Sequence, residues 1–119
     1  AFNLSEKFEK MLKKYSGNLT RAAVELAQIW RTDKALRNLE ATMIAASGNK
    51  MYLISGIGDV IEPDGDVLEV GSGGEYARAA AVALLENTTL DATTIAKKAI
   101  EIAASICVFT NNHITVEEV

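Results

Sequence analysis

The spacing of the hydrophobic residues changes twice along this chain, and the change limits the folds that the chain can adopt. Residues 4–15 repeat their apolar positions at helical spacing, which places on one face Leu4, Phe8, Met11, Leu12 and Tyr15. Asn18 is a residue type that caps helices, and it predicts that a second helix begins directly after it. The buried face of that second helix is predicted to contain Leu19, Ala23, Leu26, Ala27 and Trp30. A short helical piece with Leu36 and Leu39 is predicted to follow.

The middle of the chain is strand-like. Thr42–Ala46 and Met51–Ile54 are predicted to form a hairpin around the turn Ser47–Lys50, and Val60-Ile61 is a short extended piece. A further strand is predicted at Val67–Val70. These segments indicate an antiparallel meander.

Helical spacing then returns. One helix is predicted from Gly74 to about Glu86, and another follows Asp91, a good N-cap, and continues through Ile106. The tail alternates again, with Ile114 and Val116 on one face, which predicts a last strand. Because helices are segregated from the meander, the fold class is predicted to be α+β, as a layered sandwich. A length of 119 residues fits a single domain, 1–119.

Composition narrows the class of protein. The formal net charge is −4, and the lysines are interleaved with acids, so nothing indicates nucleic-acid binding. No apolar run approaches the ~20 residues that span a bilayer. The chain has one cysteine, Cys107, so no intrachain disulfide can form, and a reducing, cytoplasmic location is the default. The apolar neighbours of Cys107 favour a buried structural thiol over a reactive one.

The stretch Gly71-Ser72-Gly73-Gly74 separates an apolar run from an alanine-rich helix and leaves three interpretations open. A glycine-rich turn at a helix N-terminus can bind phosphate, but no lysine follows Gly74 as the P-loop pattern requires. A nucleophile elbow requires G-x-S-x-G, and the glycines here are spaced wrongly by one residue on both sides. The third interpretation is plain turn chemistry.

Metal-binding patterns are weak. Cys107 and the only histidine, His113, have no partners at zinc-ligand spacing. The loops 56–59 and 63–66 are too short for a calcium loop and are interpreted as turns. Residue-by-residue reasoning therefore gives an α+β domain with one serine-bearing turn and no activity.

Four stretches resemble the HslV family of bacterial proteasome-like peptidases over nearly the whole chain. They read AAVELAQIWRTDKALRNLEATMIAA, LISGIGDVIEP, VGSGGEYARAAAVALLENT and IAASICVFTNNHITVEEV. The resemblance implies an N-terminal-nucleophile hydrolase fold, an αββα four-layer sandwich. It also implies two stacked hexameric rings, an HslU-type ATPase ring that binds the nucleotide, and unfolded protein substrates in the cytoplasm. The implied chemistry is peptide-bond hydrolysis by an N-terminal threonine.

The resemblance also assigns residues. Ser72 matches a serine beside the threonine's amino group, a supporting hydroxyl and not the nucleophile. Backbone carbonyls of Ala104, Cys107 and Thr110 match the ligands of a monovalent cation, with sodium expected, although Ala104-Ser105 stands where relatives often carry Gly-Asp. The family's N-terminal segment, with the nucleophilic threonine and a lysine, has no counterpart in these residues. The chain is therefore expected to be the C-terminal portion of a subunit and to be inactive alone. The alternative is a catalytically dead ring subunit or assembly module.

Overall fold

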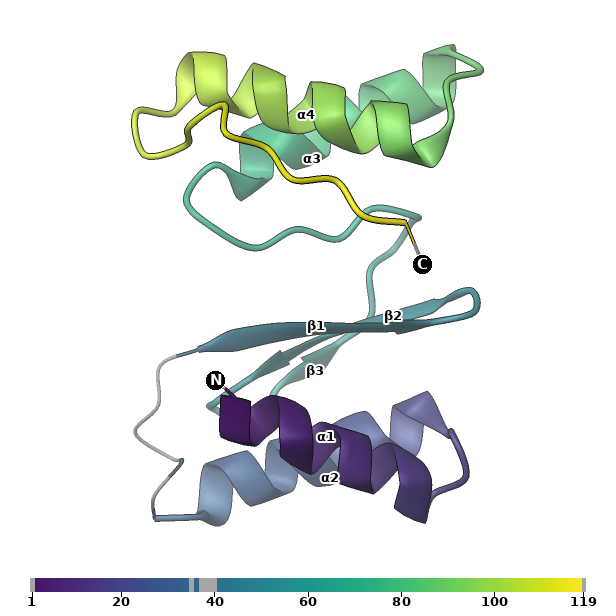
Figure 1. The fold of residues 1–119 in the computed structure, drawn as a ribbon, viewed down its shortest axis with the longest axis vertical. Helices are drawn as coiled ribbons and strands as arrows, with labels where there is room; N and C mark the ends of the chain where they lie inside the picture. The colour runs from purple at the N-terminus through teal and green to yellow at the C-terminus, as the bar shows by residue number, and fades with distance from the viewer. Residues whose placement is uncertain (1, 35, 37–40, 119) are drawn as a thin grey trace. The chain divides into compact units, whose positions relative to one another are not determined.

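The computed structural model describes residues 2–34, 36 and 41–118, and it divides the chain into two compact units. Unit 1 is Ala1–Asp66 and unit 2 is Val67–Val119. Each unit is described by itself (Figure 1). The prediction of one domain over 1–119 stays a prediction.

Two helices open unit 1, as the spacing of apolar residues predicts. Helix α1 is Phe2–Lys14 and helix α2 is Leu19–Thr32. The Asn18 side chain accepts a hydrogen bond from the Arg21 amide at 3.1 Å, so the predicted cap is confirmed. The predicted buried face is also confirmed, since the buried residues of α2 are Leu19, Ala22, Ala23, Leu26, Ala27 and Trp30.

The meander forms a three-stranded antiparallel sheet in the order β1-β2-β3. The strands are β1 (Thr42–Ser47), β2 (Lys50–Ser55) and β3 (Val60–Ile61). Ser47 pairs with Lys50, so the hairpin loop has two residues, and its Gly48 takes a φ of +60° that suits glycine. Both the hairpin and the short third strand are as predicted.

The core of unit 1 lies between the helices and one face of this sheet. Ala45, Tyr52 and Ile54 alternate onto that face and pack with Trp30 and Leu26 of α2. Figure 1 shows α1 and α2 on this single side of the strands. The Tyr52 hydroxyl reaches the Thr20 hydroxyl at 2.6 Å, which satisfies the polar end of a buried ring.

Unit 2 is a helix pair. Helix α3 is Gly74–Asn87 and helix α4 is Ala92–Ile106, with Asp91 accepting a hydrogen bond from the Thr94 amide at 2.9 Å. The two helices lie side by side (Figure 1). Small side chains let the two backbones approach closely, and the buried core is Ala77, Ala81, Ile95, Ala99 and Ala103. Within the described part of the chain, no helix has the length and hydropathy to cross a bilayer.

Two predicted strands are wrong. Val67–Val70 and the tail around Ile114 and Val116 have no strand assignment. A strand needs a neighbour for its backbone hydrogen bonds, and neither segment pairs with another among the described residues. Leu36 is buried in a turn, while Leu39 lies outside the described residues.

Candidate functional site

The turn Gly71–Gly74 presents a serine at the start of α3. The Gly74 amide donates to the Gly71 carbonyl at 3.1 Å, which closes the turn. Gly71 has a φ of +118°, a conformation that L side chains rarely adopt. Ser72 is exposed, while Gly73 and Gly74 on its C-terminal side are buried. The backbone of this turn is therefore fixed, and the Ser72 hydroxyl is accessible to a substrate or a neighbouring group.

The charge around this turn disfavours a phosphate cradle. A Cβ added to Gly74 would lie 3.0 Å from Cγ of Glu69, so that acidic side chain covers the start of α3. Glu75 is a second carboxylate in the first turn of the helix. Carboxylates complement the positive end of the helix dipole and compete with a phosphate for it. Arg78 Nε lies 3.9 Å from Glu69 Oε2, a partly exposed pair that leaves the acid in place.

A second turn contacts the first. After α4, the Cys107 amide donates to the Ala103 carbonyl at 2.8 Å and the Thr110 amide donates to the Cys107 carbonyl at 3.1 Å. A Cβ added to Gly73 would collide with Thr110 Oγ1, and it would lie 3.2 Å from Thr110 Cβ and 3.5 Å from Ala103 Cβ. The turn 107–110 therefore packs directly on the turn that carries Ser72.

Cys107 is half-buried, so the prediction of a buried thiol is wrong. The helix end turns the thiol toward polar groups instead of an apolar core. Hydrogen bonding by the Thr110 hydroxyl, then by the Phe109 amide, lowers the pKa of the Cys107 thiol, and the Ser72 hydroxyl adds to the effect. Partial burial opposes this lowering of the pKa without cancelling it.

The expected cation ligands all belong to this C-terminal end of α4. Ala104 lies in the last turn of the helix, where carbonyls lack partners within the helix, and Cys107 and Thr110 bound the turn that follows. Carbonyl oxygens at the negative end of a helix dipole suit a hard cation such as sodium. The chemistry of these donors fits the ion, and side-chain identity matters little for it.

Other candidate metal sites are not supported. The described residues contain no group of three or more His, Cys, Asp or Glu side chains that could hold a metal ion. In the loop 56–59, the Gly58 amide donates to the Ser55 carbonyl at 3.0 Å, which confirms the interpretation of a turn. His113 is exposed, and its amide donates to the Asn111 side chain at 2.9 Å.

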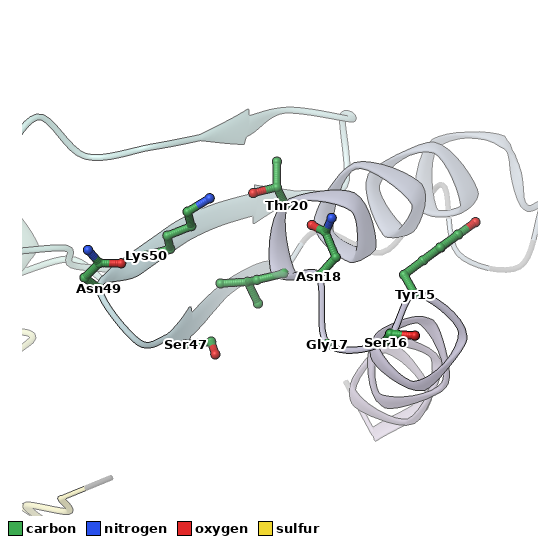
Figure 2. Close-up of a pocket in the computed structure, with 9 residues that line it drawn as sticks. Tyr15, Ser16, Gly17, Asn18, Thr20, Ser47, Asn49 and Lys50 are labelled. Atoms are coloured by element: carbon green, nitrogen blue, oxygen red, sulfur yellow. The ribbon is translucent and has the colours of Figure 1, made fainter.

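Unit 1 contains a separate polar hollow of about 510 Å³ (Figure 2). It lies between residues 15–20, which form the α1–α2 connection and the start of α2, and the β1–β2 hairpin. Lys50 is its charged lining residue, and the lining includes no cysteine, histidine or carboxylate. The hollow therefore offers no thiol, imidazole or carboxylate as a nucleophile or general base.

Comparison with known proteins decides the family. The proteasome subunit family model matches residues 2–119. The chain belongs to the proteasome subunit family. It is 64% identical over 117 residues to the ATP-dependent protease subunit HslV of Caldanaerobacter subterraneus, and 57% identical over 119 residues to that of Treponema denticola. These alignments cover 98% and 100% of this chain and 66% and 67% of the relatives.

Solved structures agree with this proteasome-family assignment. The crystal structure of eukaryotic HslV from Trypanosoma brucei matches with a TM-score of 0.90 and 49% identity, covering 98% of this chain and 67% of that one. The predicted α+β, N-terminal-nucleophile hydrolase fold class is confirmed. The chain thus spans about two thirds of the length of these HslV relatives.

The proteasome-family site residues have mixed outcomes. Ser72 lies in the predicted turn, and the turn after α4 brings Thr110 against the neighbouring Gly73. The roles of Ser72 and of the three carbonyls stay predictions. Sequence reasoning missed the packing of Thr110 on Gly73, because no local pattern joins residues that lie so far apart in the chain.

Proposed function

We propose that this chain is the C-terminal portion of the peptidase subunit of an ATP-dependent, two-component protease of the HslUV type. The subunit would hydrolyse peptide bonds of unfolded proteins with an N-terminal threonine nucleophile that lies outside these 119 residues. The observation that carries the proposal is the 64% identity to HslV across 98% of the chain.

The chain's own contribution to catalysis is the Ser72 hydroxyl. We propose that it hydrogen-bonds the α-amino group of the nucleophilic threonine and holds that amine where it can take the hydroxyl proton. The exposed position of Ser72 on a closed turn supports this role. Gly71 would let backbone approach the reacting groups closely.

The proposed assembly is a homo-oligomer of two stacked hexameric rings in the cytoplasm. An HslU-type ATPase ring would bind the nucleotide and supply unfolded substrate, and neither nucleic acid nor a membrane takes part. A sodium ion would be held by the carbonyls of Ala104, Cys107 and Thr110, where it would stabilise the C-terminal end of α4.

The alternative is a ring subunit without a nucleophile, which acts in assembly only. It shares the fold, the rings and the partner, so these properties cannot separate it from the peptidase. The two proposals differ in the residue that begins the mature full-length protein.

The experiment uses the full-length protein purified from its source. Mass spectrometry identifies its N-terminal residue, and a fluorogenic peptide reports hydrolysis with and without the ATPase partner. The peptidase predicts an N-terminal threonine and hydrolysis that falls when Ser72 is replaced in S72A, while the ring assembly is unchanged. A single hydrogen bond to a charged group is worth about 1.5–3 kcal/mol, so turnover should fall roughly 10- to 100-fold.

The outcomes separate the proposals. A mature protein with no N-terminal threonine and no hydrolysis, yet with intact rings, would replace the peptidase by the assembly module. Wild-type hydrolysis by S72A would rule out the proposed role of Ser72 without affecting the proposal that the protein is a peptidase.

A further inference from the structure

We propose that the polar hollow of unit 1 binds a short acidic peptide segment of a protein partner. All the residues that line the hollow belong to unit 1, whereas Ser72 and the expected cation ligands belong to unit 2. The binding is therefore a function separate from the proposed peptide hydrolysis, and it does not rest on it.

The lining of the hollow supplies hydrogen-bond donors that a carboxylate can accept. The donor-bearing side chains include Ser16, Asn18, Ser47, Asn49 and Lys50. Figure 2 shows that they come from both sides of the hollow, the helix connection and the hairpin. Asn18 Oδ1 already accepts a hydrogen bond from the Arg21 amide, which leaves the NH2 group as the donor of that side chain. A volume of about 510 Å³ is within the range of ligand sites, roughly 300–1,000 Å³, and this lining suits a polar ligand.

The segments that form the hollow are basic. Residues 10–24 contain four cationic side chains and no acid, and residues 41–58 contain one cation, Lys50, and no acid. Among the residues that the structure describes, none of these five cations forms an ion pair. The chain as a whole has a formal net charge of −4, so this basic region stands out locally and attracts an anionic partner.

Tyr15 lines the hollow and contacts two of the cations. Lys14 Nζ lies 5.3 Å and Arg21 Cζ lies 4.4 Å from the centroid of the Tyr15 ring. These cation–π contacts orient the two side chains, and a nearby anion reduces the repulsion between the two like charges. Lys50 adds a third cation on the hairpin side of the hollow. Three cations around one hollow fit a ligand with more than one carboxylate.

A short acidic peptide fits this surface better than a nucleic acid does. The Tyr15 ring already contacts two cations, so it is not free to stack on a base. Glu9 and Glu25 flank the basic segment 10–24, which restricts the favourable contacts to a short ligand. A nucleic acid carries a phosphate at every nucleotide, so a longer strand would bring some of its charges toward these acids.

The experiment measures binding of a fluorescein-labelled acidic peptide, GSEEDEEGS, to the full-length protein by fluorescence anisotropy. GSQQNQQGS is the neutral control peptide. K50Q and R21Q each remove one positive charge at the hollow and keep a polar side chain. K97Q is the matched control, because Lys97 is an exposed lysine of α4 in unit 2.

We expect the acidic peptide to bind and the neutral peptide not to bind. K50Q and R21Q should each weaken binding about 2- to 5-fold, as for exposed charge pairs, while K97Q should equal the wild type. The double variant should combine the two losses, and added salt should weaken binding because the charges are exposed. Melting temperatures are measured alongside, and K50Q on the exposed hairpin keeps the test valid if R21Q loses stability.

Three results would overturn the proposal. One is absence of binding by the acidic peptide, and another is an equal loss in K97Q and K50Q, which would show that attraction to the peptide is not local. The third is displacement of the labelled peptide by a single-stranded oligonucleotide or by inorganic phosphate at a lower concentration than by the unlabelled peptide, which would indicate a nucleic-acid or small-anion site instead. None of these results bears on the proposed peptidase, which is measured by hydrolysis and by the N-terminal residue.

Discussion

Replacing Gly73 with alanine tests the contact between the two turns by stability alone. Gly73 has a φ of −93° and a ψ of 7°, so its backbone conformation is open to alanine and carries no left-handed strain. The added methyl group would nevertheless collide with Thr110 Oγ1 and lie 3.2 Å from Thr110 Cβ. The predicted cost is therefore steric and specific to Thr110.

The magnitude follows from two opposing effects. Overpacking a well-filled site costs typically 1–3 kcal/mol. Alanine also restricts the unfolded chain, which offsets roughly 0.4–1 kcal/mol. We expect G73A to lower the free energy of unfolding by about 1–2 kcal/mol. Rotation of the Thr110 side chain can relieve the collision with Oγ1 but not the close contact with Cβ, so part of the steric cost remains.

The assay is urea denaturation of the full-length protein at fixed protein concentration, since assembly affects apparent stability. G65A is the matched control, because Gly65 has no neighbouring atom within 4 Å of an added Cβ and no positive φ. G65A should equal the wild type or exceed it by up to ~1 kcal/mol.

Thr110 supplies the decisive comparison. In a T110A background the colliding hydroxyl is absent, so the cost of G73A should shrink by at least ~0.5 kcal/mol. If G73A is as stable as wild type, or if its cost is the same in both backgrounds, the two turns do not pack as described.

Three further predictions concern the rest of the chain. Hydrogen bonds from Thr94 lower the pKa of Asp91. The stability that Asp91 contributes is therefore present above its unfolded pKa near 3.9 and is lost as pH falls through the lower folded pKa. The D91A variant should show a weaker loss of stability at acidic pH, measured by thermal melts at stepped pH. Trp30 is fully buried, so W30A should cost about 3–5 kcal/mol in urea denaturation, and a cost under ~1 would contradict the described core. Y52F removes the 2.6 Å bond to Thr20 and should cost about 0.5–1.5 kcal/mol, a loss that T20V should share without adding to Y52F.

Local patterns in the sequence predicted local structure well. The caps at Asn18 and Asp91 were predictable because the side chain bonds an amide only three residues away. The hairpin was predictable because glycine and asparagine suit a two-residue loop between alternating segments. The turn at Ser72 was predictable for the same reason, as a break between an apolar run and a helix.

Long-range structure was predicted less well. Alternation at Val67–Val70 and in the tail suggested strands, but a strand depends on a partner that the alternation does not supply. The burial of Cys107 was predicted from apolar neighbours in sequence, whereas its exposure depends on the helix ending at Ile106. The contact of Thr110 with Gly73 depends on how α3 and α4 pack, and no spacing in the chain encodes it.

The second face of the unit 1 sheet gives information about the fold that the helices do not give. Its second face, opposite α1 and α2, contains the paired row Ile44, Leu53 and Ile61, with Ile44 41% and Ile61 50% exposed. A sheet with one solvated face would alternate apolar with polar residues, yet this sheet is apolar on both faces. Strands of that kind are typical of the middle of a layered structure. The register and exposure of this row therefore agree with the layered sandwich of an N-terminal-nucleophile hydrolase.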